Sequence, residues 1–502
     1  MTRTGLCRSA LALLLLPGLC GCTEHMLASA PADAAKPWKD GATASASAGT
    51  APNFGVAPQP EVAVLQPAPS IVADKTYSLP ELIDIAQQEN PLTRLAWQQA
   101  RQAALTAGMV EATFLPFISA NVIAGRQDVT QSLPVPVLGH DQVTNTIEGV
   151  SPQIALQWLV FDFGQRSALH DAAKHNATAA NIMFNGAHQK IIHDVTQAYY
   201  LYGAARGRVR IASRNVANSR QIEDAASARM RGGLGTTVEL AQARQAVAQA
   251  QFGLVKAEGL EQDTYQGLLG AMGISPMTRL RVTDPAGRRL PADAGKPTEA
   301  MITAALARRP DVLASFSAMQ ASRAGVSAAQ AELLPKVYLG AIAAGGSNDI
   351  SAAGLPTIGQ QASATGIVIG ATMPLFDGGL RAAQLKNAQS LAAASEATFQ
   401  TARNSAAHEI VVGADTLRSA LASYRAASAL AEAAAVTYDA AFSAYRAGVG
   451  TITVATTADS GLLAAEQART DGYAASLVAA ANLAFVLGSM TSSQPPATAI
   501  ER

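Results

Sequence analysis

Long stretches of the chain place apolar or small residues at steps that alternate between four and three, the spacing of helices that pack as coiled coils. Between Gly379 and Ala447 there is no proline, and Gly413 is the only interior glycine. The seam in its C-terminal part consists of Leu417, Leu421, Tyr424, Ser428, Ala431, Ala435, Tyr438, Phe442 and Tyr445. About 65–70 helical residues at 1.5 Å each predict a rod on the order of 100 Å.

Two more segments show the same spacing. One contains Leu463, Thr470, Tyr473, Leu477, Ala480, Ala484 and Leu487, interrupted by Glu466. The other contains Val195, Ala198, Tyr202, Ala205, Val209, Ala212 and Val216. Periodicity alone fits a soluble coiled-coil rod equally well.

Four other stretches alternate apolar and polar residues, which is the pattern of β-strands. The apolar sets are Ile118, Ala120, Val122 and Ala124; Ile154, Leu156, Trp158 and Val160; Val337, Leu339, Ala341 and Ala343; and Ile367, Ile369, Ala371 and Met373. Each predicted strand is about 10–12 residues long, enough to cross a bilayer at a tilt. We expect loops at roughly 126–150 and 345–364, which are rich in Gly, Ser, Thr, Asn and Pro.

Four strands cannot close a barrel, and an open sheet in lipid leaves backbone groups unpaired. The chain is therefore expected either to share a barrel with other copies or not to enter a membrane.

The sequence contains one pattern twice. Asn90-Pro91 and Leu115-Pro116 return 219 residues later, as Arg309-Pro310 and Leu334-Pro335. Phe161-Asp162-Phe163-Gly164 and Gly233-Leu234-Gly235-Thr236 return 215 residues later, as Phe376-Asp377-Gly378-Gly379 and Gly448-Val449-Gly450-Thr451. We expect a first repeat over residues 76–297, a second over 298–490 and a tail over 491–502.

Composition narrows the class of protein. The length allows three globular domains, but the repeat indicates two copies of one unit. Charged residues are only 15 % of the chain and the net charge is zero, so no basic face for nucleic acid is expected. The 49 % of hydrophobic residues argues against a disordered chain.

The N-terminus has the features of an export signal. Arg3 and Arg8 precede a short apolar run, and Leu19-Cys20-Gly21-Cys22 resembles a bacterial lipobox. We expect a signal peptide over residues 1–21, lipidation at Cys22 and a Pro/Ala-rich tether over 22–75. By the same resemblance to bacterial lipoproteins, Thr23 directly after Cys22 favours delivery to the outer membrane. The alternative is an ordinary signal peptide in which Cys22 is incidental.

From Tyr77 to Gly488 the chain resembles the TolC-like outer membrane efflux family. The resemblance rests on the Asn90-Pro91 helix start, the Leu-Pro strand starts, the Phe-Asp-x-Gly corners, the paired Gly-x-Gly-Thr turns and the closing Leu487-Gly488. It implies a mainly α fold with a membrane β-barrel, in which a homotrimer of twelve strands and twelve helices forms a passive exit duct. The implied partners are outer membrane lipid, a periplasmic membrane-fusion adaptor and an inner-membrane pump of the RND or ABC type.

By the same resemblance, a gate lies beside the tip turns at Gly233, Gly235, Gly448 and Gly450. Tyr445 falls on the latch tyrosine and Glu239 on its acidic partner, whereas Gly450 replaces the latch arginine. Val454 and Thr457 stand at the positions of the family's aspartate ring, and Asp459 is a candidate for displaced acidity. The alternative for Tyr445 is a plain seam residue.

Catalytic chemistry finds little support. The chain has no Gly-x-Ser-x-Gly, phosphate-binding Gly-rich Lys loop or His-Glu-x-x-His motif. His170 and His175 are five residues apart, too far around a helix to share a metal. Asp162 with Gly164, and Asp377 with Gly379, form strand-to-helix corners at which the carboxylate accepts from helix N–H groups. We therefore expect no enzyme activity, metal or cofactor.

Three functions stay open: small-molecule efflux, type I protein secretion, and a lipid-anchored coiled-coil structural protein of the envelope without a pore. The lipobox favours efflux. The stretches His193–Tyr200 and Phe161–Arg166 look like the branch around the cyclolysin secretion component, which favours protein secretion.

Overall fold

In this computed structural model, residues 74–137, 140–291, 295–352 and 358–490 are described, together with a few short stretches before residue 74. The predicted signal peptide, Cys22 and the predicted tail lie outside the described residues. Residues 1–67 form a unit of their own, in which the structure describes the 3-10 helix η1 (Pro60–Val62). The elements that follow all belong to residues 68–502.

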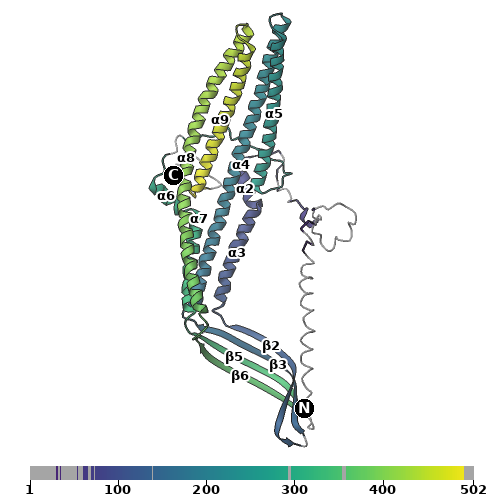
Figure 1. Cartoon of the computed structure of the whole chain (residues 1–502), viewed down its shortest axis with the longest axis vertical. Helices are drawn as coiled ribbons and strands as arrows, with labels where there is room; N and C mark the ends of the chain where they lie inside the picture. Colours follow the sequence, from purple (N-terminus) through teal and green to yellow (C-terminus); the bar gives the residue numbers. More distant parts are fainter. Residues whose placement is uncertain are drawn as a thin grey trace, which may run out of the picture. The chain divides into compact units, whose positions relative to one another are not determined.

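Long helices dominate these residues (Figure 1). The two longest, α4 (Gln165–Arg231) and α8 (Leu380–Ala447), have 67 and 68 residues. At 1.5 Å per residue each is about 100 Å long, which confirms the rod predicted over residues 379–447. The shorter helices are α2 (Leu79–Glu89), α3 (Pro91–Ala112), α5 (Thr237–Met272), α6 (Glu299–Leu306), α7 (Pro310–Ala331) and α9 (Ile452–Val486).

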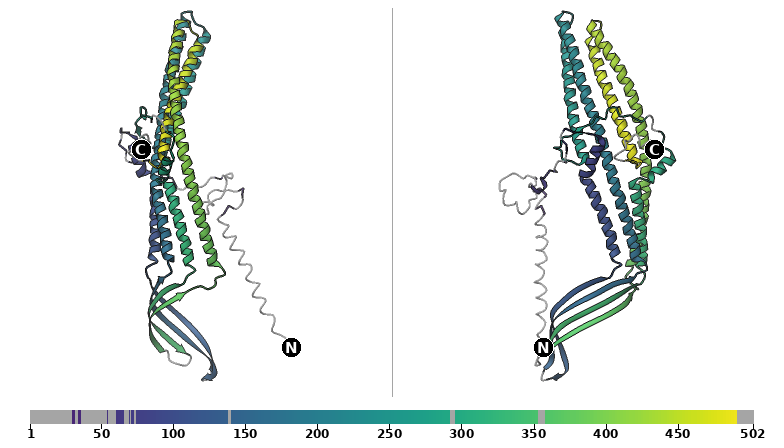
Figure 2. Two further views of the ribbon diagram at one scale, coloured as in Figure 1. Left: turned by 90° about the vertical axis from the view of Figure 1, so that its left-hand side faces the viewer. Right: turned by 180° about the vertical axis from the view of Figure 1, so that it is seen from behind.

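The helices pack along their lengths in a repeated arrangement. Helices α3 and α5 both lie against α4, and α7 and α9 both lie against α8, while α4 also contacts α7 and α9 (Figure 2). The predicted seam residues Leu417, Leu421 and Tyr445 are buried. Glu466, which interrupts the seam of α9, forms an ion pair with Arg214 of α4 at 3.2 Å. None of the helices in the described ranges is long and apolar enough to cross a membrane.

The four long strands form one antiparallel sheet in the order β2-β3-β5-β6. They are β2 (Phe117–Val137), β3 (His140–Phe161), β5 (Lys336–Ala352) and β6 (Ile358–Thr372). The predicted strand length of 10–12 residues was wrong, because the strands have 15 to 22 residues and include most of both predicted loops.

Cross-strand pairs explain this extension. Thr146 donates to Asp128 at 2.6 Å and Arg126 forms an ion pair with Glu148 at 2.8 Å, all within the predicted first loop. Such polar pairs stabilise neighbouring strands without an apolar face. A pattern restricted to apolar alternation therefore underestimates the length of the sheet.

A compact core lies where α2 meets the middle of α4 and the C-terminal ends of α5 and α9. The short strand β1 (Thr76–Tyr77) pairs in parallel with β4 (Arg281–Val282). At the predicted start of α2, the Ser78 backbone N–H and hydroxyl both donate to Glu81, at 2.8 and 2.7 Å. The core consists mainly of Leu82, Ile83, Ile191, Val195, Leu268, Leu269, Met272, Leu477 and Ala481.

Candidate functional site

The turns that join α4 to α5 and α8 to α9 form the two tips of the helical part (Figure 1). Gly233 and Gly448 have φ values of 73° and 83°, a left-handed conformation that favours glycine and ends a helix. Thr236 and Thr451 then cap the next helices, because their hydroxyls accept the N–H groups of Glu239 and Val454. The local sequence therefore suffices to build both turns.

The second glycine of each turn allows a close backbone approach. A Cβ at Gly235 would lie 3.1 Å from the backbone nitrogen of Met230, and one at Gly450 would lie 3.1 Å from that of Tyr445. All four predicted tip glycines therefore lie in the two turns.

Arg229 of α4 approaches the tip of the other hairpin and contacts Tyr445 of α8. Its guanidinium lies 5.1 Å from the centre of the Tyr445 ring and donates to the Tyr445 carbonyl oxygen at 3.0 Å. It also donates to the carbonyl oxygen of Leu234 at 3.3 Å. Sequence reasoning missed Arg229, although a basic residue in the last turn of a helix is a known signal for binding terminal carbonyls.

Tyr445 and its predicted partner Glu239 do not form a hydrogen bond. The Tyr445 side chain is fully buried, and its hydroxyl has no hydrogen-bond partner among the described residues. Within the same ranges, Oε2 of Glu239 also has none. Burial and then the charge of Glu239 raise the pKa of Tyr445, whereas Arg229 lowers it. The two residues are therefore neighbours that interact through charge.

Asp459 lies inside the contact between α9 and α4. It accepts hydrogen bonds from Asn215 at 3.0 Å, Ser219 at 2.8 Å and Asn218 at 3.1 Å. Burial raises the pKa of Asp459 despite these three donors. Burial, followed by the charge of Asp459, raises the pKa of Tyr438 to about 12. With 4 % of its surface exposed, Asp459 joins two helices and does not present its charge at the surface of the chain.

Val454 and Thr457, the predicted ring positions, are exposed on α9. They line a groove between α8 and α9 with about 940 Å³ of empty space. Leu430 and Thr437 of α8 and Gly461 of α9 also line it. The neutral Val454 and Thr457 therefore border a largely apolar groove.

The strand-to-helix corners have the same geometry in both halves. Asp162 accepts the backbone N–H groups of Gly164 and Arg166 at 3.2 and 3.0 Å. Asp377 accepts those of Gly379 and Arg381 at 3.0 and 3.2 Å. Gly164 and Gly379 have φ values of 88° and 89°. These carboxylates hold the first turns of α4 and α8. Within the described ranges, no group of three or more His, Cys, Asp or Glu residues lies where it could hold a metal ion.

Comparison with known families identifies the architecture. The model of the outer membrane efflux protein family matches residues 82–274 and 301–489, one match for each half of the chain. The chain belongs to the outer membrane efflux protein family. This membership confirms the resemblance seen in the sequence, together with the expected outer membrane location and the role of an export channel.

Individual relatives of the chain support this assignment. Protein CyaE of Bordetella pertussis is 27 % identical over 83 % of this chain and 85 % of its own length. The pyoverdine export outer membrane protein OpmQ of Pseudomonas putida is 28 % identical over 58 % of this chain and 63 % of its own.

Solved structures of the efflux family confirm the TolC-like fold. The outer membrane protein VceC of Vibrio cholerae matches with a TM-score of 0.68 at 20 % identity, over 82 % of this chain and 96 % of VceC. The open-state outer membrane channel MtrE of Neisseria gonorrhoeae matches with a TM-score of 0.65 at 20 % identity, over 87 % of this chain and 98 % of MtrE.

Proposed function

We propose that three copies of this chain form the exit duct of a tripartite export system, together with a periplasmic membrane-fusion adaptor and an inner-membrane pump of the RND or ABC type. The order of the sheet carries this proposal, because β2 and β6 each have only one neighbouring strand within the described chain. A free strand edge in lipid costs several kcal/mol for each unpaired backbone group. A barrel shared between copies, of twelve strands in a trimer, removes both edges.

The outer helices support the same assembly. Helices α3 and α8 expose large apolar side chains along their lengths. These are Leu92, Leu95, Leu105 and Met109 on α3, and Leu391, Val412, Leu430 and Val436 on α8. Such rows are expected where neighbouring copies pack, because a monomer seldom exposes a long apolar stripe.

Conductance of the purified protein in planar lipid bilayers tests the duct. We expect a trimer in detergent that conducts once reconstituted. A monomer that is soluble without detergent and does not conduct would instead support a structural coiled-coil protein of the envelope without a pore.

We propose small-molecule export as one substrate class and type I protein secretion as the second candidate. The match to OpmQ, whose name specifies pyoverdine export, favours the first. The likeness of residues 193–200 and 161–166 to the branch around the cyclolysin secretion component favours the second. Deleting the gene separates them: increased sensitivity to drugs indicates efflux, and loss of one secreted protein indicates type I secretion.

We further propose that the two helical tips form the periplasmic gate of the duct. The Arg229–Tyr445 contact, which joins the α4–α5 hairpin to the α8–α9 hairpin, supports this role. Glu239 is proposed to tune this contact by its charge, and the neutral Val454 and Thr457 to line the constriction. Since Asp459 is enclosed between α4 and α9, we propose that it holds the two hairpins together rather than attracting cations.

Lipidation at Cys22 is a separate proposal that rests on the lipobox. Mass spectrometry of the N-terminal peptide from the mature protein is expected to find an acylated Cys22. Replacing Cys22 with Ser is expected to abolish the modification, whereas cleavage at a different residue would show an ordinary signal peptide.

A further inference from the structure

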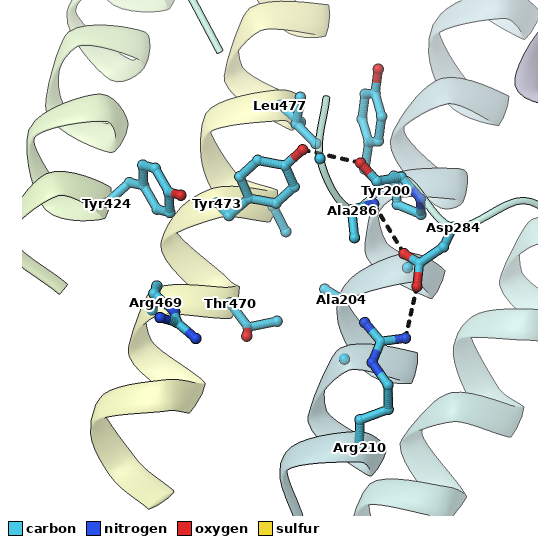
Figure 3. Close-up of a pocket in the computed structure, with 15 residues that line it drawn as sticks. Tyr200, Ala204, Arg210, Asp284, Ala286, Tyr424, Arg469, Thr470, Tyr473 and Leu477 are labelled. Carbon is cyan, nitrogen blue, oxygen red and sulfur yellow. Dashed lines mark hydrogen bonds and ion pairs between the residues drawn. The ribbon is translucent and has the colours of Figure 1, made fainter. Parts of the chain in front are cut away.

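A cavity outside the tips lies between the two halves of the chain, near the middle of the long helices (Figure 3). It has about 630 Å³ of empty space. Helix α4 forms one wall and α9 another, Tyr424 of α8 closes one side, and the segment after β4 forms the roof. Its lining therefore comes from both repeats.

Close packing gives the cavity a defined shape. A Cβ at Gly203 would lie 2.2 Å from Cγ of Pro285, so only glycine lets the roof approach α4 this closely. A Cβ at Gly207 would lie 2.8 Å from Cγ2 of Thr470. The Tyr473 hydroxyl contacts the carbonyl oxygen of Pro285 at 3.0 Å and thereby holds the roof to α9.

The cavity has one charged group without a counter-ion. Arg210 forms an ion pair with Asp284 at 2.7 Å, and Asp284 also accepts the N–H of Ala286 at 3.0 Å (Figure 3). Arg469 lines the same cavity and is half-buried, yet among the described residues it has no ion pair or hydrogen bond. With two arginines and one aspartate, the lining carries a net charge of +1.

The other lining groups indicate what else a bound anion would carry besides its negative charge. The rings of Tyr424 and Tyr473 lie 5.6 Å apart, and Ala204, Ala474 and Leu477 add apolar surface. The Thr470 hydroxyl, next to Arg469, makes no hydrogen bond to the described residues and can donate to a ligand. A guanidinium matches the planar, two-oxygen geometry of a carboxylate, and aromatic and apolar walls suit a planar organic body.

We propose that this cavity binds a small organic anion with one carboxylate on an aromatic body, in which Arg469 and Thr470 hold the carboxylate and the body lies against the paired tyrosine rings. A single negative charge balances the net charge of the lining. Such a ligand would bridge α4 of the first repeat with α8 and α9 of the second. The proposal does not depend on which substrate the duct exports.

Titration of the full-length protein in detergent with benzoate, followed by saturation-transfer NMR, tests the site. We expect saturable binding with a Kd of about 1 mM, typical of a ligand with few atoms. Replacing Arg469 with Met is expected to weaken it about tenfold or more, since hydrogen bonds to a charged group are lost. Arg220→Met is the matched control, because Arg220 is an exposed arginine of α4 outside the cavity, and binding is expected to stay within about twofold.

Two further ligands keep the test decisive if Arg469→Met fails to fold. Benzamide has the same ring without the charge, and inorganic phosphate has the charge without the ring. Benzamide is followed by the same NMR measurement, and phosphate, which has no carbon-bound protons, by its displacement of benzoate. Both are expected to bind the unchanged protein about tenfold more weakly than benzoate, or worse. The proposal is overturned if benzoate does not saturate, if Arg469→Met binds it equally well, or if benzamide or phosphate binds as tightly.

Discussion

Asn90 and Arg309 stand at equivalent positions of the two repeats, and each holds the end of a helix from its own half. Nδ2 of Asn90 donates to the carbonyl oxygen of Ala271 at 3.2 Å. Nη1 of Arg309 donates to the carbonyl oxygen of Val486 at 3.3 Å. The donors are 219 residues apart and the acceptors 215, which are the two offsets of the sequence repeat. The equivalent hydrogen bond to a helix-end carbonyl oxygen is therefore donated by an amide in the first repeat and by a guanidinium in the second.

Replacing Arg309 with Met is expected to destabilise the second repeat. Arg309 is 7 % exposed and forms ion pairs at 2.6 Å with Asp311 and with Glu409. Both acids are half-exposed and regain water when the arginine is lost, so we expect about 1–3 kcal/mol less free energy of unfolding. Denaturant unfolding in detergent, followed by circular dichroism, measures this change.

Arg323→Met is the control for that experiment. Arg323 pairs with Glu396 at 3.2 Å, and both side chains are about half-exposed. An exposed pair contributes about 1 kcal/mol or less, so this variant is expected to unfold almost like the original protein. If both variants lost the same free energy of unfolding, Arg309 would have no special structural role.

The tip contact predicts a difference between two variants in single-channel conductance. Tyr445→Phe removes a hydroxyl that has no partner among the described residues, so conductance is expected to stay the same. Arg229→Gln removes the charge that contacts the ring and carbonyl of Tyr445, and is expected to increase the time spent open. If the Tyr445 hydroxyl itself held the gate closed, Tyr445→Phe would instead change the conductance in planar bilayers and Arg229→Gln would leave it unchanged.

Asp459 predicts a pH dependence of stability. Its folded-state pKa is raised by burial, whereas the unfolded value is about 3.9. The folded state therefore binds a proton more readily than the unfolded chain, so this group favours folding at low pH and loses that contribution as pH rises through the folded pKa. Asp459→Asn is expected to unfold at a higher temperature than the original protein at pH 7.

The advantage of Asp459→Asn is expected to shrink as the pH is lowered towards about 4. Thermal unfolding of both proteins across this range, followed by circular dichroism, measures the difference. A difference that is the same at every pH would contradict the titration of Asp459.

Two glycines in helices are expected to respond in opposite directions to alanine. In Gly203→Ala the new Cβ would lie 2.2 Å from Pro285, and we expect a loss of about 1–3 kcal/mol from this overpacking. At Gly253, in α5, nothing lies within 4 Å of a new Cβ, so Gly253→Ala is expected to stabilise the helix by up to about 1 kcal/mol. The midpoints of thermal unfolding measure both changes in stability. If both variants were stabilised, or both destabilised, the packing described at these two glycines would be contradicted.

The sequence alone determined the features that depend on neighbouring residues. The seam with Leu417 and Leu421 predicts a long helix because helical packing repeats every few residues. Gly233 and Thr236 define a turn and a cap within four residues, and Asp162 lies next to the N–H groups that it binds. The doubled order of these signals was also sufficient to recognise the family.

Only the tertiary structure decided which distant groups meet. Arg229 contacts Tyr445, and Asp459 accepts from Asn215, across more than 200 residues of sequence. No local pattern marks such partners, because each side chain alone fits an ordinary helix surface. Strand length likewise depended on cross-strand pairing. The position of Arg469 in a cavity lined by α4, α8 and α9 also follows only from the tertiary structure. Long-range packing brings these groups together, and no short window of sequence contains both members of a pair.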